Sequence, residues 1–482
     1  MPTQAASIKQ PPVFKLSVFT SASERFGYYI LAFLFVLYAT NIFDLPDAKS
    51  FMLFGIFSSL SYVTPAIGGY LADRIFGIRR CMIIGLCLES IGLFFTVLST
   101  FSLFAIGLSL IILGVGFYKT TPTHLLGRSY EKGDPRIDSG FTWYYMAMNV
   151  GGLLCSFAAG LLQRYFGFQI AFLFAGISLL FALLFYFIFR QTAVPEEVTA
   201  GKKSVPFYYW IFLVLSLVIS TFVISFLVLH VIVANIAFGV IALLTLVYFL
   251  YEIIRTHEEE KRRIIVAIIL ILFGLAFYIF YFQLFTSIVL FMQRSMSRQL
   301  FGYTIPTPVF LSLNPIWILI LSPILAPLYH RLGRMNKDLA VTTKFICGLF
   351  FVTLAFFILP ISIHFANADG KVSASWIIAV YGLASLAELL IAALGVAMIT
   401  HIAPKRLYGV MMGAWYLLAM AAAAILSGLC AGLANVPKTV HDPFVIAHIY
   451  SSAFLKLGIG GLVIAVVALA LNPFLKRFAS LN

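Results

Sequence analysis

Charged and phenolic side chains interrupt a long apolar stretch near the start of the chain. Ser21, Glu24, Arg25 and Tyr28 follow the spacing i, i+3, i+4, i+7, so a helix would place them on one face, with Tyr29 one turn beyond Arg25. A charge at bilayer depth costs several kcal/mol and normally faces a cavity or a partner. We therefore predict that this face lines a water-filled substrate path. The alternative is a buried structural ion pair between Glu24 and Arg25.

Two further ionisable residues lie deep in apolar segments. Lys119, in GVGFYKTTP, needs a carboxylate or a bound anion, and Glu24 is the expected protein partner if the first and fourth helices face each other. Glu388, in SLAELLIAALG, is the main acid of the second half of the chain. Because Arg25 and Lys119 lie in the first half, the two halves offer opposite charges. A small zwitterion with a separated amine and carboxylate could bind to both.

Glu89, in CLESIG, is a third ionisable residue inside an apolar segment, and it has two interpretations. It is either a neutral acid packed against its neighbours in a structural role, or a group that binds and releases a proton. The sequence leaves both interpretations open.

The composition indicates which elements position these residues. Of 482 residues, 62% are hydrophobic and only 10% are charged, whereas a soluble domain has about 25% charged residues. The sequence therefore predicts an all-α polytopic membrane protein that is surrounded by a lipid bilayer. The net charge of +14 is assigned to loops beside anionic lipid and not to a nucleic-acid surface.

Hydrophobic runs of about 20 residues predict the membrane spans. Twelve core spans are expected, at 14–42, 50–73, 79–99, 103–127, 139–163, 168–190, 264–292, 306–330, 340–364, 374–402, 407–433 and 447–474. Two more spans, at 207–227 and 230–254, bring the expected total to fourteen. The expected domains are a six-helix bundle over 1–190, a linker with the two additional helices over 191–263, and a second six-helix bundle over 264–482.

The distribution of Lys and Arg predicts the orientation in the membrane. Basic residues concentrate in alternate loops, including DRIFGIRR, EIIRTHEEEKRR and HRLGRMNKD, which places both termini in the cytoplasm. The chain has no HExxH motif, no GxSxG motif with a partner His and no metal-ligand cluster. We therefore expect no enzyme activity, no metal and no cofactor.

The segment GGYLADRIFGIRR resembles the loop motif between the second and third spans of the major facilitator superfamily. The resemblance implies that two glycines allow close helix packing, that an aspartate meets a helix end and that two arginines anchor the cytoplasmic side. In this sequence these residues are Gly68, Gly69, Asp73, Arg79 and Arg80.

A more specific resemblance is to the proton-dependent oligopeptide transporters, the POT or PTR family, of the bacterial type. FTWYYMAMNVGGLL is similar to the fifth-span signature of that family, and SLNPIWILILSPILAPL is similar to its eighth span. AELLIAALG and APKRLYGVMMGAWYL resemble its tenth and eleventh spans. The resemblance covers about 12–475 and implies the major facilitator fold, with two six-helix bundles and two extra helices between them.

The resemblance also implies roles for individual residues. Arg25 and Lys119 would bind the peptide carboxylate, and Glu388, supported by Asn314, would bind the peptide amine. Asn149 would bind the peptide backbone. The side-chain pockets would be lined by Tyr28, Tyr29, Tyr62 and Trp415. The candidates for proton coupling are Glu24, Glu388 and Glu89.

Two acids that the family associates with proton coupling or gating are missing from this sequence. Ser21 replaces the first glutamate of the first-span motif, and Gln293 stands where the seventh span has an aspartate. Phe282 replaces a further seventh-span glutamate. Substrate recognition is thus better preserved than the usual coupling residues.

The expected function is import of di- and tripeptides across the bacterial inner membrane by a monomer, with the proton coupling that the family implies. One alternative is an uncoupled facilitator or a carrier of another small zwitterion or anion. Another is a sensor that binds its ligand without transport.

Overall fold

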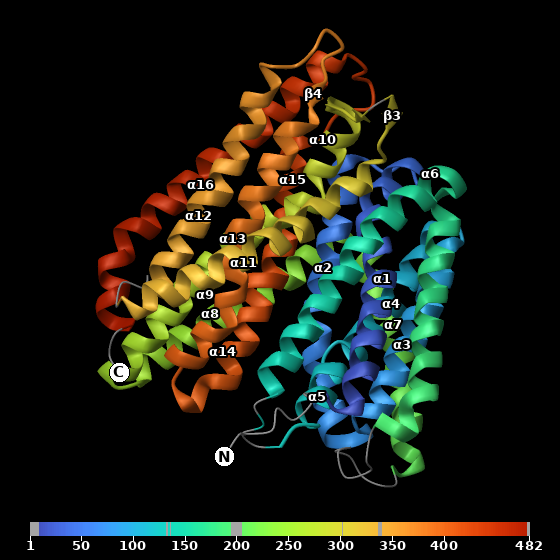
Figure 1. Cartoon of the computed structure of the whole chain (residues 1–482), viewed down its shortest axis with the longest axis vertical. Helices are drawn as coiled ribbons and strands as arrows, with labels where there is room; N and C mark the ends of the chain where they lie inside the picture. Colours follow the sequence, from blue (N-terminus) through green and yellow to red (C-terminus); the bar gives the residue numbers. More distant parts are fainter. Residues whose placement is uncertain are drawn as a thin grey trace, which may run out of the picture. The chain divides into compact units, whose positions relative to one another are not determined.

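The computed structural model describes residues 9–131, 134, 136–193, 205–300, 302–335 and 340–479. Helices make up most of these residues (Figure 1). The first part of the chain forms α1 (Pro12–Asn41), α2 (Asp47–Leu71), the π-helical turn η1 (Ala72–Phe76), α3 (Ile78–Val97), α4 (Phe101–Tyr118), α5 (Thr121–Gly127), α6 (Arg136–Ala193), α7 (Phe207–Leu229) and α8 (Val231–Arg255).

The second part begins with α9 (Glu258–Tyr281), the 3₁₀ turn η3 (Phe282–Phe285) and α10 (Ser287–Ser295). It continues with η4 (Thr307–Ser312), α11 (Leu313–Arg334), α12 (Val341–Ile363), α13 (Ala374–Ile402), η5 (Lys405–Leu407), α14 (Tyr408–Ala414), the π-helical η6 (Trp415–Ala422), α15 (Ala423–Ala431), η7 (Gly432–Ala434) and α16 (Pro443–Ala479). Four strands of two residues each form two small ladders. β1 (Met296–Ser297) pairs in parallel with β4 (Val372–Ser373), and β2 (Gln299–Leu300) pairs antiparallel with β3 (Tyr303–Thr304).

The described residues divide into two compact units. Unit 1 comprises residues up to Leu34 and Val63–Leu229, and unit 2 comprises Phe35–Tyr62 and the residues from His230 onward. In unit 1, α3 packs against α4 and α6, and α7 packs against α4. In unit 2, α12 packs against α13 and α16, and α9 packs against η6 and α13. The expected division into 1–190, 191–263 and 264–482 stays a prediction.

Twelve helices of the described part are long and apolar enough to cross a membrane. One of the twelve runs through Gly167, whose φ of 84° and ψ of 175° interrupt α6, so this helix contains both the fifth and the sixth expected spans. Helix α1, which carries Glu24 and Arg25, is not among the twelve. The fourteen expected spans are compatible with this arrangement.

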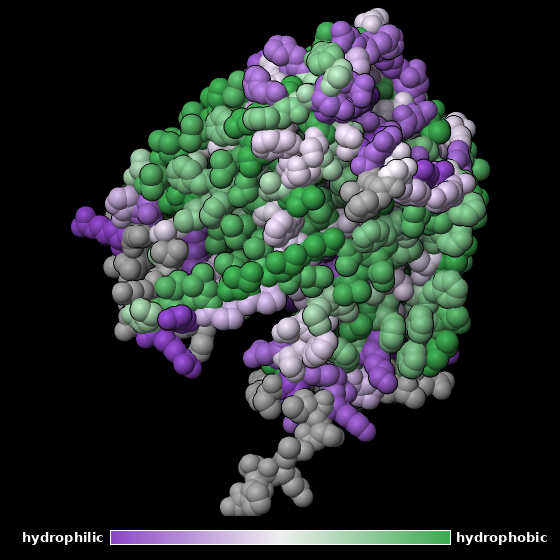
Figure 2. All heavy atoms as spheres, turned by 45° about the horizontal axis from the view of Figure 1, so that its top comes forward, coloured by the Kyte–Doolittle hydropathy of each residue, from purple (hydrophilic) through white to green (hydrophobic). Residues whose placement is uncertain are grey.

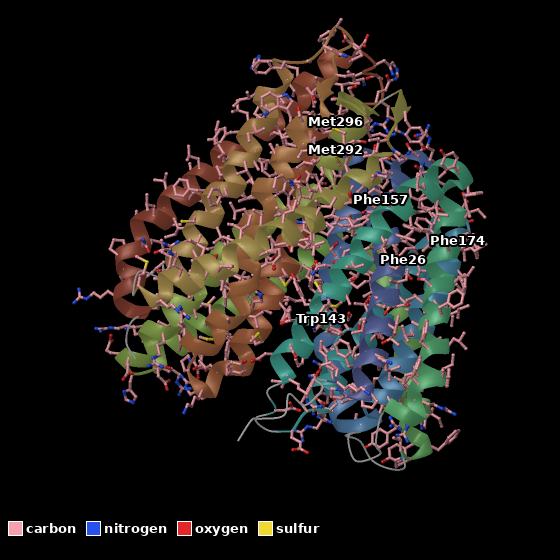
Figure 3. All side chains as sticks on the ribbon, in the orientation of Figure 1. Phe26, Trp143, Phe157, Phe174, Met292 and Met296 are labelled. Atoms are coloured by element: carbon pink, nitrogen blue, oxygen red, sulfur yellow. The ribbon has the colours of Figure 1, made fainter. Side chains whose placement is uncertain are left out.

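The helix surfaces show the distribution expected of spans in lipid. In Figure 2 the visible face is mostly apolar, and hydrophilic residues gather mainly toward its top and bottom margins. On α6, Phe157 and Phe174 are 42% and 49% exposed (Figure 3). In a membrane these exposed rings can contact lipid.

Several expected continuous spans are broken in the structure. The fourth span, expected over 103–127, consists of α4 and α5, with Lys119 and Thr120 between them. The seventh consists of α9, η3 and α10, and Thr286, with φ −121° and ψ −97°, interrupts it. Periodicity detects the apolar run but not these local irregularities. At Lys119 the backbone stays right-handed helical and its N–H still donates to the Val115 carbonyl, whereas Thr286 leaves the helical conformation.

An ion pair fixes the start of α2 inside unit 2. Asp47 is 5% exposed in its side chain and accepts hydrogen bonds from Arg294 Nη1 and Nη2 at 2.5 and 2.9 Å. The same carboxylate accepts a hydrogen bond from the Val436 backbone N–H at 3.2 Å, and Arg294 also donates to Tyr450 Oη at 3.4 Å. The bidentate pair with the partly exposed Arg294 guanidinium satisfies the buried charge of Asp47.

Candidate functional site

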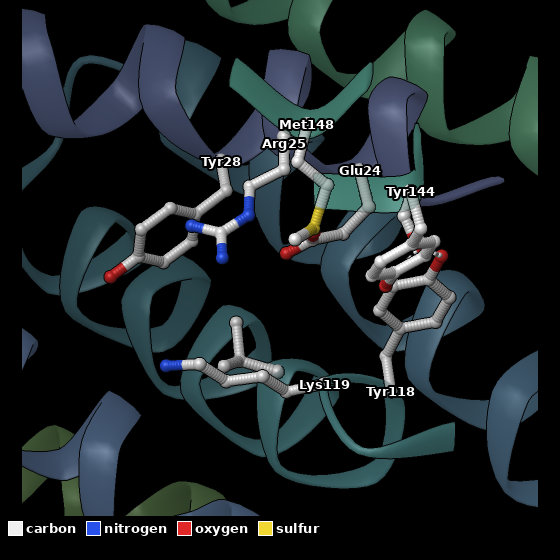
Figure 4. Close-up of a pocket in the computed structure, with 9 residues that line it drawn as sticks. Glu24, Arg25, Tyr28, Tyr118, Lys119, Tyr144 and Met148 are labelled. Carbon is white, nitrogen blue, oxygen red and sulfur yellow. Dashed lines mark hydrogen bonds between the residues drawn. The ribbon is translucent and has the colours of Figure 1, made fainter. Parts of the chain in front are cut away.

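A pocket in unit 1 contains the polar face that the sequence predicts for α1. Its cavity of about 30 Å³ has room for one or two water-sized groups. Figure 4 shows the acid and the two cationic side chains on its walls. The lining residues are Ser21, Glu24, Arg25, Tyr28, Val115, Tyr118, Lys119, Tyr144 and Met148.

The charges of this pocket act on one another. Arg25 Nη1 donates a hydrogen bond of 2.7 Å to Tyr29 Oη, and its guanidinium lies 5.3 Å from the centre of that ring. Glu24, which is 8% exposed, interacts electrostatically with both Arg25 and Lys119. One carboxylate thus faces two cations. The excess positive charge can be balanced by the carboxylate of a bound molecule.

Ser21 contributes hydrogen bonds at the position where the family pattern has an acid. Its hydroxyl shares a hydrogen bond of 2.8 Å with Tyr144 Oη and a longer one of 3.5 Å with Tyr118 Oη. Ser21 is 2% exposed. This corner of the pocket is therefore a neutral network of three hydroxyl groups.

Unit 2 presents an acid surrounded by neutral donors. Asn314 Nδ2 donates to Glu388 Oε2 at 2.7 Å, and Tyr281 Oη donates to Oε1 at 3.5 Å. Ser385 fixes Asn314 by accepting from its Nδ2 at 3.1 Å. The predicted pairing of Asn314 with Glu388 is present in this geometry. Because these donors carry no charge, the carboxylate keeps its full negative charge when ionised and can bind an ammonium group.

The other predicted substrate residues lie in different surroundings. Asn149 Nδ2 donates to the Tyr145 carbonyl one turn earlier in α6, at 2.9 Å. Tyr62 packs edge-on against Phe282 with 6.0 Å between ring centres. Trp415 is 1% exposed. A Cβ at Gly395 would lie 2.1 Å from the Trp415 ring, so the indole fills the groove left by this glycine. The roles of these residues as substrate contacts stay predictions.

The GGYLADRIFGIRR motif forms local contacts inside unit 1. A Cβ at Gly68 would lie 1.9 Å from the Gly116 carbonyl oxygen, so α2 and α4 meet at backbone distance there. At Gly69 the nearest atom would be 3.4 Å away, which is an ordinary contact. Asp73 lies 3.3 Å from Arg128 Nη2, just after α5.

The arginines of this motif lie at the start of α3. Arg80 Nη1 donates to the Phe76 carbonyl at 3.3 Å. Arg79 interacts electrostatically with Tyr186 of α6. The role of both arginines as cytoplasmic anchors stays a prediction.

A second ionic contact outside the spans fixes the loop before α6. Arg136 donates to both carboxylate oxygens of Asp134, at distances from 2.7 to 3.2 Å, and Nη1 also donates to the Lys9 carbonyl. These hydrogen bonds lower the pKa of Asp134 below its usual value.

Comparison with known proteins identifies the family of this arrangement. The sequence profile of the POT family matches residues 75–449. The chain belongs to the POT family. It is 36% identical to dipeptide and tripeptide permease A of Escherichia coli, over 99% of this chain and 95% of that protein. It is 34% identical to dipeptide and tripeptide permease B of Salmonella typhimurium, over 98% of this chain and 96% of that protein.

Solved structures of POT proteins have the same fold. A bacterial homologue of the human drug peptide transporters superposes with a TM-score of 0.84 at 29% identity, over 97% of this chain and 99% of that one. A peptide transporter POT crystallised with sulfate gives a TM-score of 0.86 at 24% identity, which supports the fold alone. The chain is therefore a multi-pass, all-α membrane protein with the major facilitator fold.

Sequence reasoning missed several residues that complete the two sites. Tyr118, Tyr144 and Met148 line the pocket of unit 1, and Tyr281 donates to Glu388 in unit 2. The available signal was polarity inside apolar runs: Tyr118 precedes Lys119, and Tyr144 belongs to the aromatic run FTWYYMAMN. The spacing of residues within one helix does not indicate which face of a neighbouring helix that helix contacts.

Proposed function

We propose that the protein is a secondary active transporter that imports di- and tripeptides across the bacterial inner membrane, with proton coupling. The observation that carries this proposal is that the two sites have opposite net charge. The pocket of unit 1 has one acid and two cations, whereas the Glu388 site of unit 2 has an acid among neutral donors. The names of the relatives, dipeptide and tripeptide permeases, support peptides as the substrate class.

In this proposal each site binds one end of the peptide. Arg25 and Lys119 bind the carboxylate, and Glu388 binds the ammonium group, with Asn314 and Tyr281 fixing its orientation. Transport then proceeds by alternating access of the two six-helix bundles. The protein acts as a monomer, and both termini lie in the cytoplasm. Glu24, Glu89 and Glu388 are the candidates for carrying the proton.

The experiment that tests the function is dipeptide uptake into proteoliposomes with and without an imposed inward proton gradient. Accumulation above the outside concentration, seen only with the gradient, supports a proton-coupled transporter. Absence of both uptake and dipeptide exchange would refute the peptide proposal and point to another small zwitterion or anion.

An uncoupled facilitator is the second candidate, and two contacts favour it. Ser21 shares hydrogen bonds with tyrosine hydroxyls, and Gln293 Oε1 accepts a hydrogen bond from Thr307 Oγ1. Both positions are uncharged at every physiological pH. Uptake that equilibrates the dipeptide but never concentrates it, even under the gradient, would establish this candidate.

A further inference from the structure

Glu89 is a buried acid without a hydrogen-bond donor. It lies on α3, is 1% exposed, and neither of its carboxylate oxygens has a hydrogen-bond partner among the described residues. Buried polar groups are nearly always hydrogen-bonded, and an ionised carboxylate without partners is far more costly than a neutral one. This environment therefore favours the carboxyl group that carries its proton.

The fold provides a slot for this side chain. A Cβ at Gly114 of α4 would lie 2.4 Å from Glu89 Cγ and 2.7 Å from the Glu89 backbone nitrogen. A Cβ at Gly85, one turn earlier on α3, would lie 2.8 Å from the Gly114 carbonyl oxygen. Both glycines bring α3 and α4 to backbone distance, and Glu89 fills the space left by the missing side chain of Gly114.

Glu89 is electrostatically connected to the pocket of unit 1. The charged groups that act on it are Glu24 of α1 and Lys119, which directly follows α4. Lys119 in turn interacts with Glu24 and Arg25. Glu89, Glu24, Lys119 and Arg25 therefore form one set of interacting charges, three of which line the pocket.

The polar groups of the other elements packed against α3 contact other residues. On α6, the Gly176 carbonyl accepts a hydrogen bond from Ser90. In η1 and α5, Asp73 and His124 lie 3.7 Å apart, and Asp73 also pairs with Arg128. Burial acts most strongly on Glu89, and the charged groups that act on it are those of the pocket.

We infer that Glu89 is a proton-binding residue whose proton controls the affinity of the pocket for the peptide carboxylate. With Glu89 neutral, Arg25 and Lys119 outweigh Glu24 by one positive charge, and an anionic group is attracted. With Glu89 ionised, the four charges cancel and this attraction is lost. Linkage requires the reciprocal effect, so a bound carboxylate favours the protonated acid. The inference rests on the proposed function. It assigns one of the co-transported protons to Glu89, a residue that does not line the pocket.

This arrangement gives symport without an acid at position 21 or 293. The proton enters from water on the side where the peptide binds, resides on a Glu89 oxygen, and returns to water on the other side after the peptide has left. No bond other than O–H forms or breaks. When Glu89 is ionised, the four groups have no net charge and the pocket binds the peptide weakly. Peptide binding is therefore coupled to proton binding.

The test compares wild-type protein with Glu89→Gln, which has nearly the same shape and cannot ionise. Glu131→Gln is the matched control, because Glu131 is an exposed glutamate in the loop between α5 and α6. Dipeptide counterflow, which needs no net proton movement, is measured beside gradient-driven accumulation in proteoliposomes. Proton uptake on dipeptide binding is measured by calorimetry in buffers of different ionisation enthalpy.

The inference predicts that Glu89→Gln keeps dipeptide counterflow within about twofold of wild type but loses gradient-driven accumulation. On dipeptide binding, this variant should take up fewer protons than wild type, by up to about one proton per peptide. Glu89→Asp should restore part of the accumulation. Accumulation or proton uptake equal to wild type in Glu89→Gln would overturn the inference. Loss of counterflow together with accumulation would also overturn it, since the residue would then be structural. Absence of exchange in the wild-type protein would overturn the proposed function, and this inference with it.

Discussion

Replacing Glu388 by glutamine is the sharpest single test of the amine-binding site. The amide keeps the size of the side chain and can still contact Asn314 and Tyr281, which now donate at 2.7 and 3.5 Å. The change therefore removes the charge while altering little of the packing. We expect the affinity for a dipeptide with a free amine to fall.

The size of the loss follows from the electrostatics of the site. A carboxylate and an ammonium group about 4 Å apart interact by about 4 kcal/mol at an effective dielectric constant of about 20. Since about 1.4 kcal/mol corresponds to tenfold in affinity, the charge contributes roughly three decades. Glutamine can still accept one hydrogen bond from the ammonium group, worth about 1 kcal/mol. The expected loss is therefore on the order of a hundredfold or more.

The assay measures dipeptide binding by calorimetry to wild type, Glu388→Gln and the control Glu131→Gln. The same measurements with an N-acetylated dipeptide complete a double cycle, because acetylation removes the positive charge of the ligand. The substitution should have little effect on the acetylated ligand. A dipeptide affinity in Glu388→Gln within about threefold of wild type, or equal losses for both ligands, would refute the assignment.

Three further predictions concern the framework. Asp47→Asn leaves Arg294 without its buried counter-ion, so the free energy of unfolding should fall by about 2–4 kcal/mol. The fall is measured as a lower midpoint of thermal unfolding in detergent, and an unchanged midpoint would contradict the prediction. Gly68→Ala places a methyl group 1.9 Å from a carbonyl oxygen of α4, so a loss of about 1–3 kcal/mol is expected in the same assay, whereas Gly69→Ala, with 3.4 Å of space, should be near neutral. Arg136 lowers the pKa of Asp134 in the folded protein, so this contact stabilises the segment above the unfolded pKa of about 3.9 and is lost as pH falls through the lower folded value. The protection factors of the amides around Arg136, with exchange corrected for its intrinsic pH dependence, should fall on acidification in wild type and stay constant in Asp134→Asn.

Composition and helical spacing predicted much of the fold and one face of the site. The apolar content required membrane helices, and the spacing of Ser21, Glu24, Arg25 and Tyr28 placed them on one face, which lines the pocket. This was possible because both signals are local. The interval between residues fixes their angle around one helix, whatever the rest of the chain does.

The parts that the sequence did not predict depend on contacts between helices. The break at Lys119 and the hydroxyl network of Tyr118 and Tyr144 depend on how α1, α4 and α6 meet. The grouping of Phe35–Tyr62 with the second half of the chain is also tertiary. It is accompanied by the ion pair between Asp47 and Arg294, which are 247 positions apart. No local pattern in the sequence predicts such a distant pairing.

The distribution of counter-ions separates structural acids from those that can serve transport. Acids at helix ends are paired with fixed guanidinium groups, as seen in Asp47–Arg294, Asp73–Arg128 and Glu252–Arg406. Such pairs hold the ends of helices together. Within the part of the chain that the structure describes, Glu388 has only uncharged donors and Glu89 has no donor. The charge of these two acids is therefore free to respond to a proton or to a bound ammonium group. Ser21 and Gln293 replace acids that the family associates with proton coupling or gating. We therefore expect Glu89 and Glu388 to provide the proton coupling instead.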